Sequence, residues 1–210
     1  MDIYLVEKIY EGDYGCEEPG AAGPMATLIL KPLQSDTAEK FSVEVPEKTL
    51  SAQGISEGKK VCFKENGEIL KYVRVVAAVI YEIKDGERRI FTTARGYGEY
   101  KGWWEFPGGK IEQGETPRQA IVREIKEELN AEIVPEEYIK TIEYDYPTFH
   151  LSMDCFWAKI VSGRIELKEA EAARWLGKDE IKSVAWLPAD LELVEDLKDK
   201  FSYGGKKDDH

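Results

Sequence analysis

The chain has 210 residues, of which 42% are hydrophobic and 11% aromatic, a composition typical of a soluble globular protein with one or two domains. Its formal net charge of -12 disfavours binding to nucleic-acid polymers and to anionic membranes, because both depend on basic surfaces. The apolar stretches are far shorter than the roughly 20 residues that cross a bilayer, and the N-terminus lacks the pattern of a secretion signal. We therefore expect a cytoplasmic protein with no membrane partner.

The first 73 residues contain short β-branched runs separated by turns, among them an Asn66-Gly67 pair typical of a tight hairpin. The runs predict strands over residues 3–10, 27–30, 41–45, 60–63 and 69–73. No Lys or Arg cluster is interleaved with aromatics here, which disfavours a nucleic-acid-binding barrel. We interpret residues 1–73 as a small all-β domain for packing or oligomerisation, which leaves a homodimer as an option.

From residue 74 onward the pattern changes to longer elements in which strands and helices are mixed. The predicted strands cover residues 75–83, 89–93, 103–106, 139–144, 151–161 and 184–187. One helix ends near residue 129, and a second covers residues 191–200. This order predicts a layered α/β domain over residues 74–202, with helices packed against a sheet, followed by a disordered tail over 203–210.

Local signals define the first of these helices closely. Thr116 is a typical N-cap, Pro117 suits the first helical position, and Gln119 completes a capping box. Asn130 tolerates the left-handed conformation that ends a helix. We therefore expect a helix over residues 117–129.

This helix has an acidic face and an apolar face. At 100° per residue one arc holds the apolar side chains of Ile121, Val122, Ile125 and Leu129, and another holds the carboxylates of Glu124, Glu127 and Glu128. An acidic helix face alone is more often a solvated surface than a site. Like charges at this spacing destabilise a helix, however, and oxygen ligands suit a hard cation such as Mg²⁺. Such a cation would also offset the repulsion between this acidic chain and a polyphosphate substrate.

A glycine pair precedes the helix, and its spacing to the acidic residues is specific. Gly108 has no side chain, so its backbone carbonyl can come close to a bound cation. The spacing from Gly109 through Glu115 and Arg123 to the three glutamates matches the Nudix box, so residues 74–200 resemble the Nudix hydrolase family, MutT-like branch. Asn130 and Ala131 depart from the box, where the family prefers a glycine and a larger aliphatic residue.

The resemblance implies a Nudix α/β/α sandwich with a mixed sheet, preceded by the small all-β domain. It implies that the metal, Mg²⁺ with Mn²⁺ as a substitute, is bound by Gly108, Glu124, Glu127 and Glu128. By the same resemblance Glu115 and Arg123 form a supporting pair, and Lys110 and Arg95 contact phosphates. An additional glutamate is expected before the end of the domain. Glu169 fits best and Glu171 is the competitor, and whether Glu124 or Glu169 is the general base stays open.

The resemblance also implies the activity, the hydrolysis of a nucleoside triphosphate to the monophosphate and pyrophosphate. For the base pocket it points to Phe106, Tyr146 and Asp190, although core packing of the aromatics and an N-cap role of Asp190 are alternatives. Oxidised guanine nucleotides such as 8-oxo-dGTP and pyrimidine nucleotides such as CTP or dCTP are both compatible. The competing functions are cleavage of ADP-ribose or a dinucleotide, and a non-catalytic nucleotide-sensing module.

Overall fold

The computed structural model describes residues 1–12, 23–34, 39–197 and 200–201, so the tail expected at 203–210 lies outside the described residues. The contacts divide the chain into two units. The first consists of Met1–Val73 with Tyr144–Ser152, and the second of Arg74–Glu143 with Met153–His210. The sequence did not predict that residues 144–152 group with the first unit. None of the described helices is long and apolar enough to cross a membrane.

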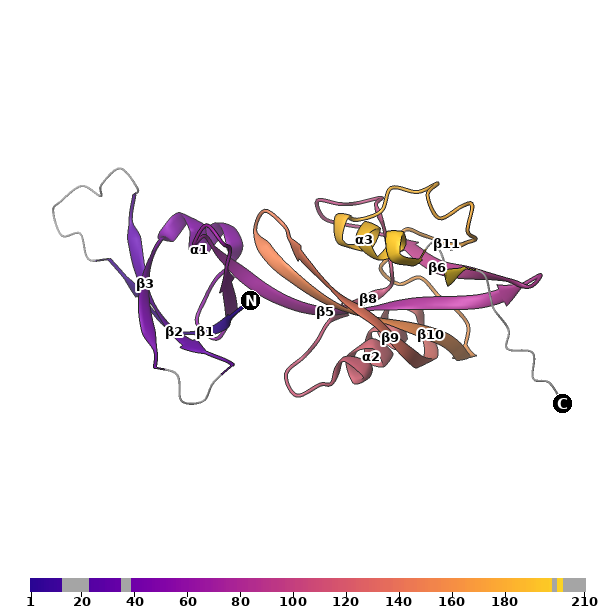
Figure 1. Ribbon diagram of the computed structural model, residues 1–210, viewed down its shortest axis with the longest axis horizontal. Helices are drawn as coiled ribbons and strands as arrows, with labels where there is room; N and C mark the ends of the chain where they lie inside the picture. The colour runs from indigo at the N-terminus through magenta and orange to yellow at the C-terminus, as the bar shows by residue number, and fades with distance from the viewer. Residues whose placement is uncertain (13–22, 35–38, 198–199, 202–210) are drawn as a thin grey trace. The chain divides into compact units, whose positions relative to one another are not determined.

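The first unit is built mainly from antiparallel strands (Figure 1). Its elements are β1 (Ile3–Glu11), β2 (Met25–Pro32), β3 (Phe41–Pro46), α1 (Glu47–Gln53), β4 (Lys60–Phe63) and the start of β5 (Ile69–Lys84). β1 lies between β2 and β4, β3 pairs with β2, and β5 pairs with β4. Alternating apolar side chains of these strands form a separate buried core that includes Val6, Leu28, Leu30 and Val61.

The short helix α1 was not predicted. It has seven residues, too few for hydrophobic periodicity to show, and ends at Gly54 in the left-handed conformation, φ 61°. Gln53 connects it to β5, because its side-chain amide donates to the Ile69 carbonyl at 3.0 Å and accepts from the Lys71 amide at 3.1 Å. Tertiary contacts of this kind stabilise a helix whose local signals are weak.

The second unit has the mixed α/β architecture that the sequence predicted. Its strands are the remainder of β5, with β6 (Glu87–Ala94), β7 (Trp104–Glu105), β8 (Gly108–Lys110), β9 (Ala131–Asp145), β10 (Phe149–Gly163) and β11 (Ala172–Leu176). β5 pairs with β6, β8 and β10, and β6 pairs with β7 and β11. Helices α2 (Pro117–Leu129) and α3 (Pro188–Leu197) lie on opposite sides of these strands (Figure 1).

Helix α2 has the bounds that its caps predict. The Thr116 side chain accepts from the Gln119 amide, the reciprocal bond of the capping box is present, and Asn130 is left-handed with φ 53°. The helix buries Ala120, Ile121, Ile125 and Leu129 against apolar residues of β5, β9 and β10. Val122 was expected on this face but is 37% exposed, so the apolar arc is narrower than predicted.

Other boundaries differ from the prediction. The two strands expected over 69–73 and 75–83 form one continuous strand of 16 residues, β5. Residues 184–187 form no strand and contribute only an isolated parallel bridge between Trp104 and Trp186. Helix α3 begins at Pro188 and not at 191, because proline is favoured in a first helical turn. Asp190 therefore lies within that turn, and its interpretation as the N-cap is wrong.

Candidate active site

Helix α2 is held close to β8 at the glycine pair. A Cβ atom on Gly109 would lie 2.4 Å from the carboxyl carbon of Glu124, and one on Gly108 would lie 2.1 Å from the Val76 carbonyl oxygen. The contact at Gly108 is with backbone and excludes any side chain, whereas a side chain at Gly109 would displace the Glu124 carboxylate. The glycines therefore allow the backbone of β8 to lie between β5 and the acidic face of the helix.

A cavity of about 570 Å³ opens over this face. It is formed by β6 and the loop that follows it, β8, α2 and the segment before β11. Its charged lining residues are Arg95, Glu105, Lys110, Glu112, Arg123, Glu124, Glu127, Glu128 and Glu169. The structure thus brings together the predicted metal ligands, both predicted phosphate contacts and the predicted additional glutamate.

The carboxyl group of Glu128 lies in an environment that disfavours its charged form. Burial, together with the nearby carboxylates of Glu105, Glu124 and Glu169, raises the pKa of its carboxyl to about 8, against a hydrogen bond from the Gly108 backbone that lowers it. A buried carboxylate beside other carboxylates is stable in its charged form only with a compensating cation.

Glu105 is a site residue that the sequence analysis missed. It lines the cavity and belongs to the short strand β7, between the apolar residues Trp104 and Phe106. Its carboxylate accepts from Arg95 Nη2 at 2.7 Å and from Arg95 Nε at 3.1 Å. An acidic residue in an alternating strand gives no catalytic signal by itself, because such a residue is normally solvated.

Arg123 organises the carboxylates at the other side of the cavity. Its Nη1 donates to Glu124 at 2.9 Å and to Glu127 at 3.1 Å, and its Nη2 donates to the Lys110 carbonyl at 3.0 Å. The same guanidinium binds both carboxylate oxygens of Glu115. One arginine therefore connects the loop before α2, strand β8 and two of the predicted metal ligands.

The structure distinguishes the two candidates for the additional glutamate. Glu169 lines the cavity, and its carboxylate accepts a hydrogen bond from the Tyr97 hydroxyl at 3.1 Å. Glu171 instead pairs with Lys101 at 3.8 Å and is not among the described residues that line the cavity. The geometry favours Glu169.

The residues expected to bind the base do not line this cavity. Phe106 is buried and stacks on Trp186, with ring centroids 4.8 Å apart, and its backbone amide donates to Asp190 Oδ1 at 2.8 Å. Burial raises the pKa of the Asp190 carboxyl to about 8. Tyr146 belongs to the first unit, where it is buried and stacks on Phe149. Their assignment to base binding stays a prediction.

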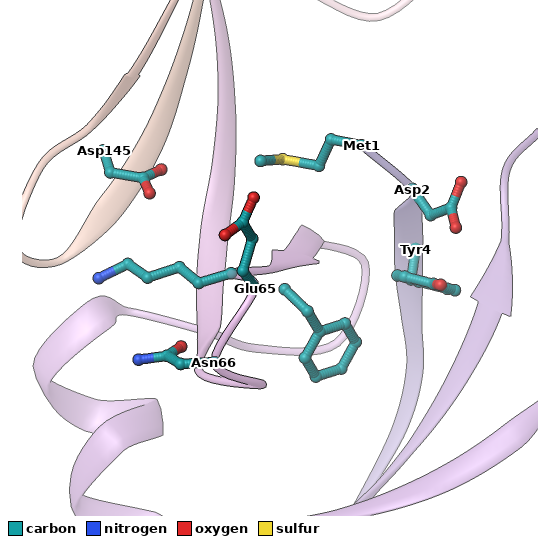
Figure 2. A pocket seen from close by; sticks show the side chains of 8 residues that line it. Met1, Asp2, Tyr4, Glu65, Asn66 and Asp145 are labelled. Atoms are coloured by element: carbon teal, nitrogen blue, oxygen red, sulfur yellow. The ribbon is translucent and has the colours of Figure 1, made fainter.

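The first unit has a cavity of its own, of about 700 Å³ (Figure 2). Its lining includes the carboxylates of Asp2, Glu65 and Asp145 and the ring of Tyr4, which packs edge-on against Phe63. Lys64, also in the lining, pairs with Glu68 at 3.1 Å. This acidic lining does not form the basic surface that a nucleic acid needs.

The second unit's cavity fits a hard divalent cation by the chemistry of its donors, which are oxygens. Within the described part of the chain, no three acidic, histidine or cysteine side chains converge into a preformed metal cage. Mg²⁺ does not need such a cage, since it is commonly bound by one or two carboxylates, several waters and substrate phosphates. The partly buried Glu128 lies beside three further carboxylates, which together supply the negative charge that such an ion requires.

The comparison with known proteins identifies the family. A family model described as the NUDIX domain matches residues 73–202, which is more than half of the chain. The chain belongs to the Nudix family. This membership places it among the Nudix hydrolases and agrees with the spacing of the box residues on α2.

Individual relatives match part of the chain. The CTP pyrophosphohydrolase of Escherichia coli is 31% identical over 126 residues, 60% of this chain and 91% of that enzyme. An 8-oxo-dGTP diphosphatase of Escherichia coli is 34% identical over 96 residues, 45% of this chain and 73% of that enzyme. The solved structure of the E. coli ORF135 protein is 29% identical with a TM-score of 0.51, covering 67% of this chain and 96% of that one. The chain therefore shares its fold over about two thirds of its length with this solved structure.

Proposed function

We propose that this chain is a Mg²⁺-dependent pyrophosphohydrolase that converts a nucleoside or deoxynucleoside triphosphate to the monophosphate and pyrophosphate. The observation that carries the proposal is the cavity in which Glu128, Glu124, Glu105 and Glu169 lie together. A cluster of carboxylates with three basic side chains in the same lining is suited to a metal–polyphosphate complex, in which the cations offset the charges of both partners.

Most of the charged residues that line the cavity have a role in this proposal. Glu124, Glu127 and Glu128, with the Gly108 carbonyl, would hold the metal, which when bound neutralises charge on the phosphate chain and polarises the phosphorus–oxygen bond. Lys110 and Arg95 line the same cavity and bind phosphate oxygens. Arg123 and Glu115 orient α2 and keep its acidic face toward the substrate.

We assign the proton acceptor to Glu169 and not to Glu124. The Glu124 carboxylate is bound by Arg123 at 2.9 Å and packs directly against Gly109, which restricts its approach to a water molecule. Glu169 projects from the segment before β11 into the same cavity. It accepts the proton as water attacks phosphorus in line with the leaving pyrophosphate, and no covalent intermediate is needed.

The relatives suggest the nucleotides to test. One relative is named a CTP pyrophosphohydrolase and several are named 8-oxo-dGTP diphosphatases, so pyrimidine triphosphates and oxidised guanine triphosphates are the substrate candidates. Phe106 and Asp190 of the second unit are kept as the proposed base-selecting residues, and the expectation for Tyr146, which belongs to the first unit, stays a prediction. Asp190 can act through Phe106, because its carboxyl oxygen Oδ1 accepts a hydrogen bond from the Phe106 backbone amide.

The experiment that tests the proposal is a substrate panel with purified protein and Mg²⁺. The panel contains CTP, dCTP, 8-oxo-dGTP, the unmodified triphosphates, ADP-ribose and a dinucleotide, with chromatographic detection of every product. We expect pyrophosphate and a monophosphate from at least one triphosphate, and no turnover after exhaustive EDTA treatment. Cleavage of ADP-ribose or the dinucleotide alone would refute the proposed substrate class, and nucleotide binding without any turnover would favour a sensor.

A further inference from the structure

Tyr97 lines the active-site cavity, and most of its aromatic side chain is exposed to solvent. It belongs to the loop between β6 and β7, and 60% of its surface is exposed. Among the described residues that line the cavity it is the one aromatic side chain. Because so much of the ring is in water, its burial contributes little to the stability of the fold.

The hydroxyl of Tyr97 donates to Oε2 of Glu169 at 3.1 Å. Partial burial and this bond to Glu169 raise the pKa of Tyr97 above its ordinary value, so the hydroxyl remains protonated and continues to donate near neutral pH. A hydrogen bond from a neutral hydroxyl to a carboxylate fixes one oxygen of that carboxylate and leaves the other available.

The backbones that carry the two residues are held together. The Glu171 amide donates to the Ala94 carbonyl at 3.0 Å, at the point where β11 begins to pair with β6. Next to this contact, a Cβ atom on Gly96 would lie 2.3 Å from the Glu169 carbonyl oxygen, so only glycine allows the approach. The donor and the acceptor are thus placed by a close backbone contact between two loops.

We infer that Tyr97 is a positioning residue for the hydrolysis, in which its hydroxyl holds the Glu169 carboxylate in the orientation that accepts the proton of the attacking water. This inference rests on the proposed role of Glu169 as proton acceptor. It does not depend on which base the substrate carries, since Tyr97 acts on Glu169.

The test is a double-mutant cycle of Tyr97→Phe and Glu169→Gln, with Tyr100→Phe as the matched control. Tyr100 is in the same loop and packs edge-on against Trp103, and it is not among the described residues that line the cavity. We expect Glu169→Gln to lower kcat by about 100-fold or more and Tyr97→Phe by about tenfold, with unchanged KM. When Glu169 is already replaced by Gln, Tyr97→Phe should have no further effect on kcat, because the glutamine side chain cannot accept the proton of the attacking water whatever its orientation. Tyr100→Phe should leave kcat unchanged.

Two kinetic results would overturn the inference. Equal effects of Tyr97→Phe with and without Glu169 would show that the hydroxyl acts independently of this carboxylate, and a raised KM with normal kcat would make Tyr97 a substrate contact. The cycle is measured on whichever substrate of the panel is turned over fastest, so failure of triphosphates alone refutes the proposed substrate class and leaves this test intact. If no substrate is turned over, the proposed activity fails, and a crystal structure of the Tyr97→Phe variant tests the positioning role instead. An unmoved Glu169 carboxylate in that structure would overturn the positioning role, and a displaced carboxylate would support it.

Discussion

Arg123 binds Glu115 through two hydrogen bonds, from Nε to Oε1 at 2.7 Å and from Nη2 to Oε2 at 2.8 Å. This pair joins the loop before α2 to the middle of the helix. The guanidinium and the Glu112 backbone amide lower the pKa of the Glu115 carboxyl to about 2, so the pair stays charged throughout the range in which an enzyme is assayed. Because Arg123 also contacts Glu124 and Glu127, the pair controls where these carboxylates point.

We predict that Arg123→Lys lowers kcat by about tenfold or more, because lysine keeps the charge but cannot make the bidentate bond to Glu115. The matched control is Arg118→Lys on the same helix. Arg118 donates to the Pro135 carbonyl at 2.7 Å and lies over the Phe156 ring, away from the cavity. The Arg118→Lys variant should have a lower melting temperature and an unchanged kcat. Similar losses of kcat in both variants would contradict the assigned role of Arg123.

We predict that Glu127→Gln lowers turnover by about 100-fold or more while the fold stays intact. The side chain of Glu127 is 60% exposed, so its removal costs little stability, and its carboxylate faces the cavity. Glu192→Gln, at an exposed position of α3, serves as the control for loss of a surface charge. Steady-state kinetics and thermal melts compare the Glu127→Gln and Glu192→Gln variants. Near-normal turnover of Glu127→Gln would show that Glu127 is not a metal ligand.

Binding of a divalent cation should release a proton at neutral pH. Without metal the pKa of Glu128 is raised to about 8, so its carboxyl is mostly protonated at pH 7 and must lose this proton to become a ligand. Cation affinity should therefore rise with pH by up to about tenfold per unit below pH 8 and level off above it. Titration calorimetry with Mn²⁺ in buffers of different ionisation enthalpy measures the released proton. Glu128→Gln should abolish the release, and an affinity independent of pH between 6 and 8 would contradict the prediction.

Asp190 should make the stability depend on pH. Its pKa is raised from 3.8 to about 8, so between these values the native state holds a proton that the unfolded state has lost. The free energy of unfolding should therefore fall as the pH rises through this window, and the contribution is fully present only at the acidic end. In Asp190→Asn the side chain cannot titrate but its carbonyl still accepts from the Phe106 amide, so the slope should flatten. Urea denaturation at a series of pH values measures the change, and an unaltered slope would contradict it.

The same variant tests whether Asp190 selects the base. We expect the ratio of kcat/KM between purine and pyrimidine triphosphates to change by about tenfold, because the second carboxyl oxygen, which can both donate and accept when protonated, is replaced by an amide nitrogen that only donates. An unchanged ratio would leave Asp190 as a structural support of the Phe106 backbone.

A truncated chain that begins at Lys71 should bind metal and retain turnover, because the acidic and basic residues of the cavity all lie beyond Arg74. Its melting temperature should be lower, since residues 144–152 lose the partners that they have in the first unit. Circular dichroism and the activity assay report the two properties separately. A folded truncated protein without hydrolysis would place part of the site in the first unit.

The sequence alone determined those features whose causes are local. The bounds of α2 followed from Thr116, Pro117, Gln119 and Asn130, because capping bonds form between residues only a few positions apart. The shared face of Glu124, Glu127 and Glu128 followed from helical geometry. The family followed from the spacing of the box residues, and the family match over 73–202 confirmed it.

Tertiary structure decided what depends on contacts between distant segments. Glu105 reaches the cavity because β7 pairs with β6. The backbone at Glu169 lies close to Gly96, and the Glu169 side chain lines the cavity while that of Glu171 pairs with Lys101. Asp190 is buried against the Phe106 amide, 84 positions away in the chain. Neither hydrophobic periodicity nor motif spacing contains such information, because the side chains concerned are placed by contacts between segments that are far apart in the chain.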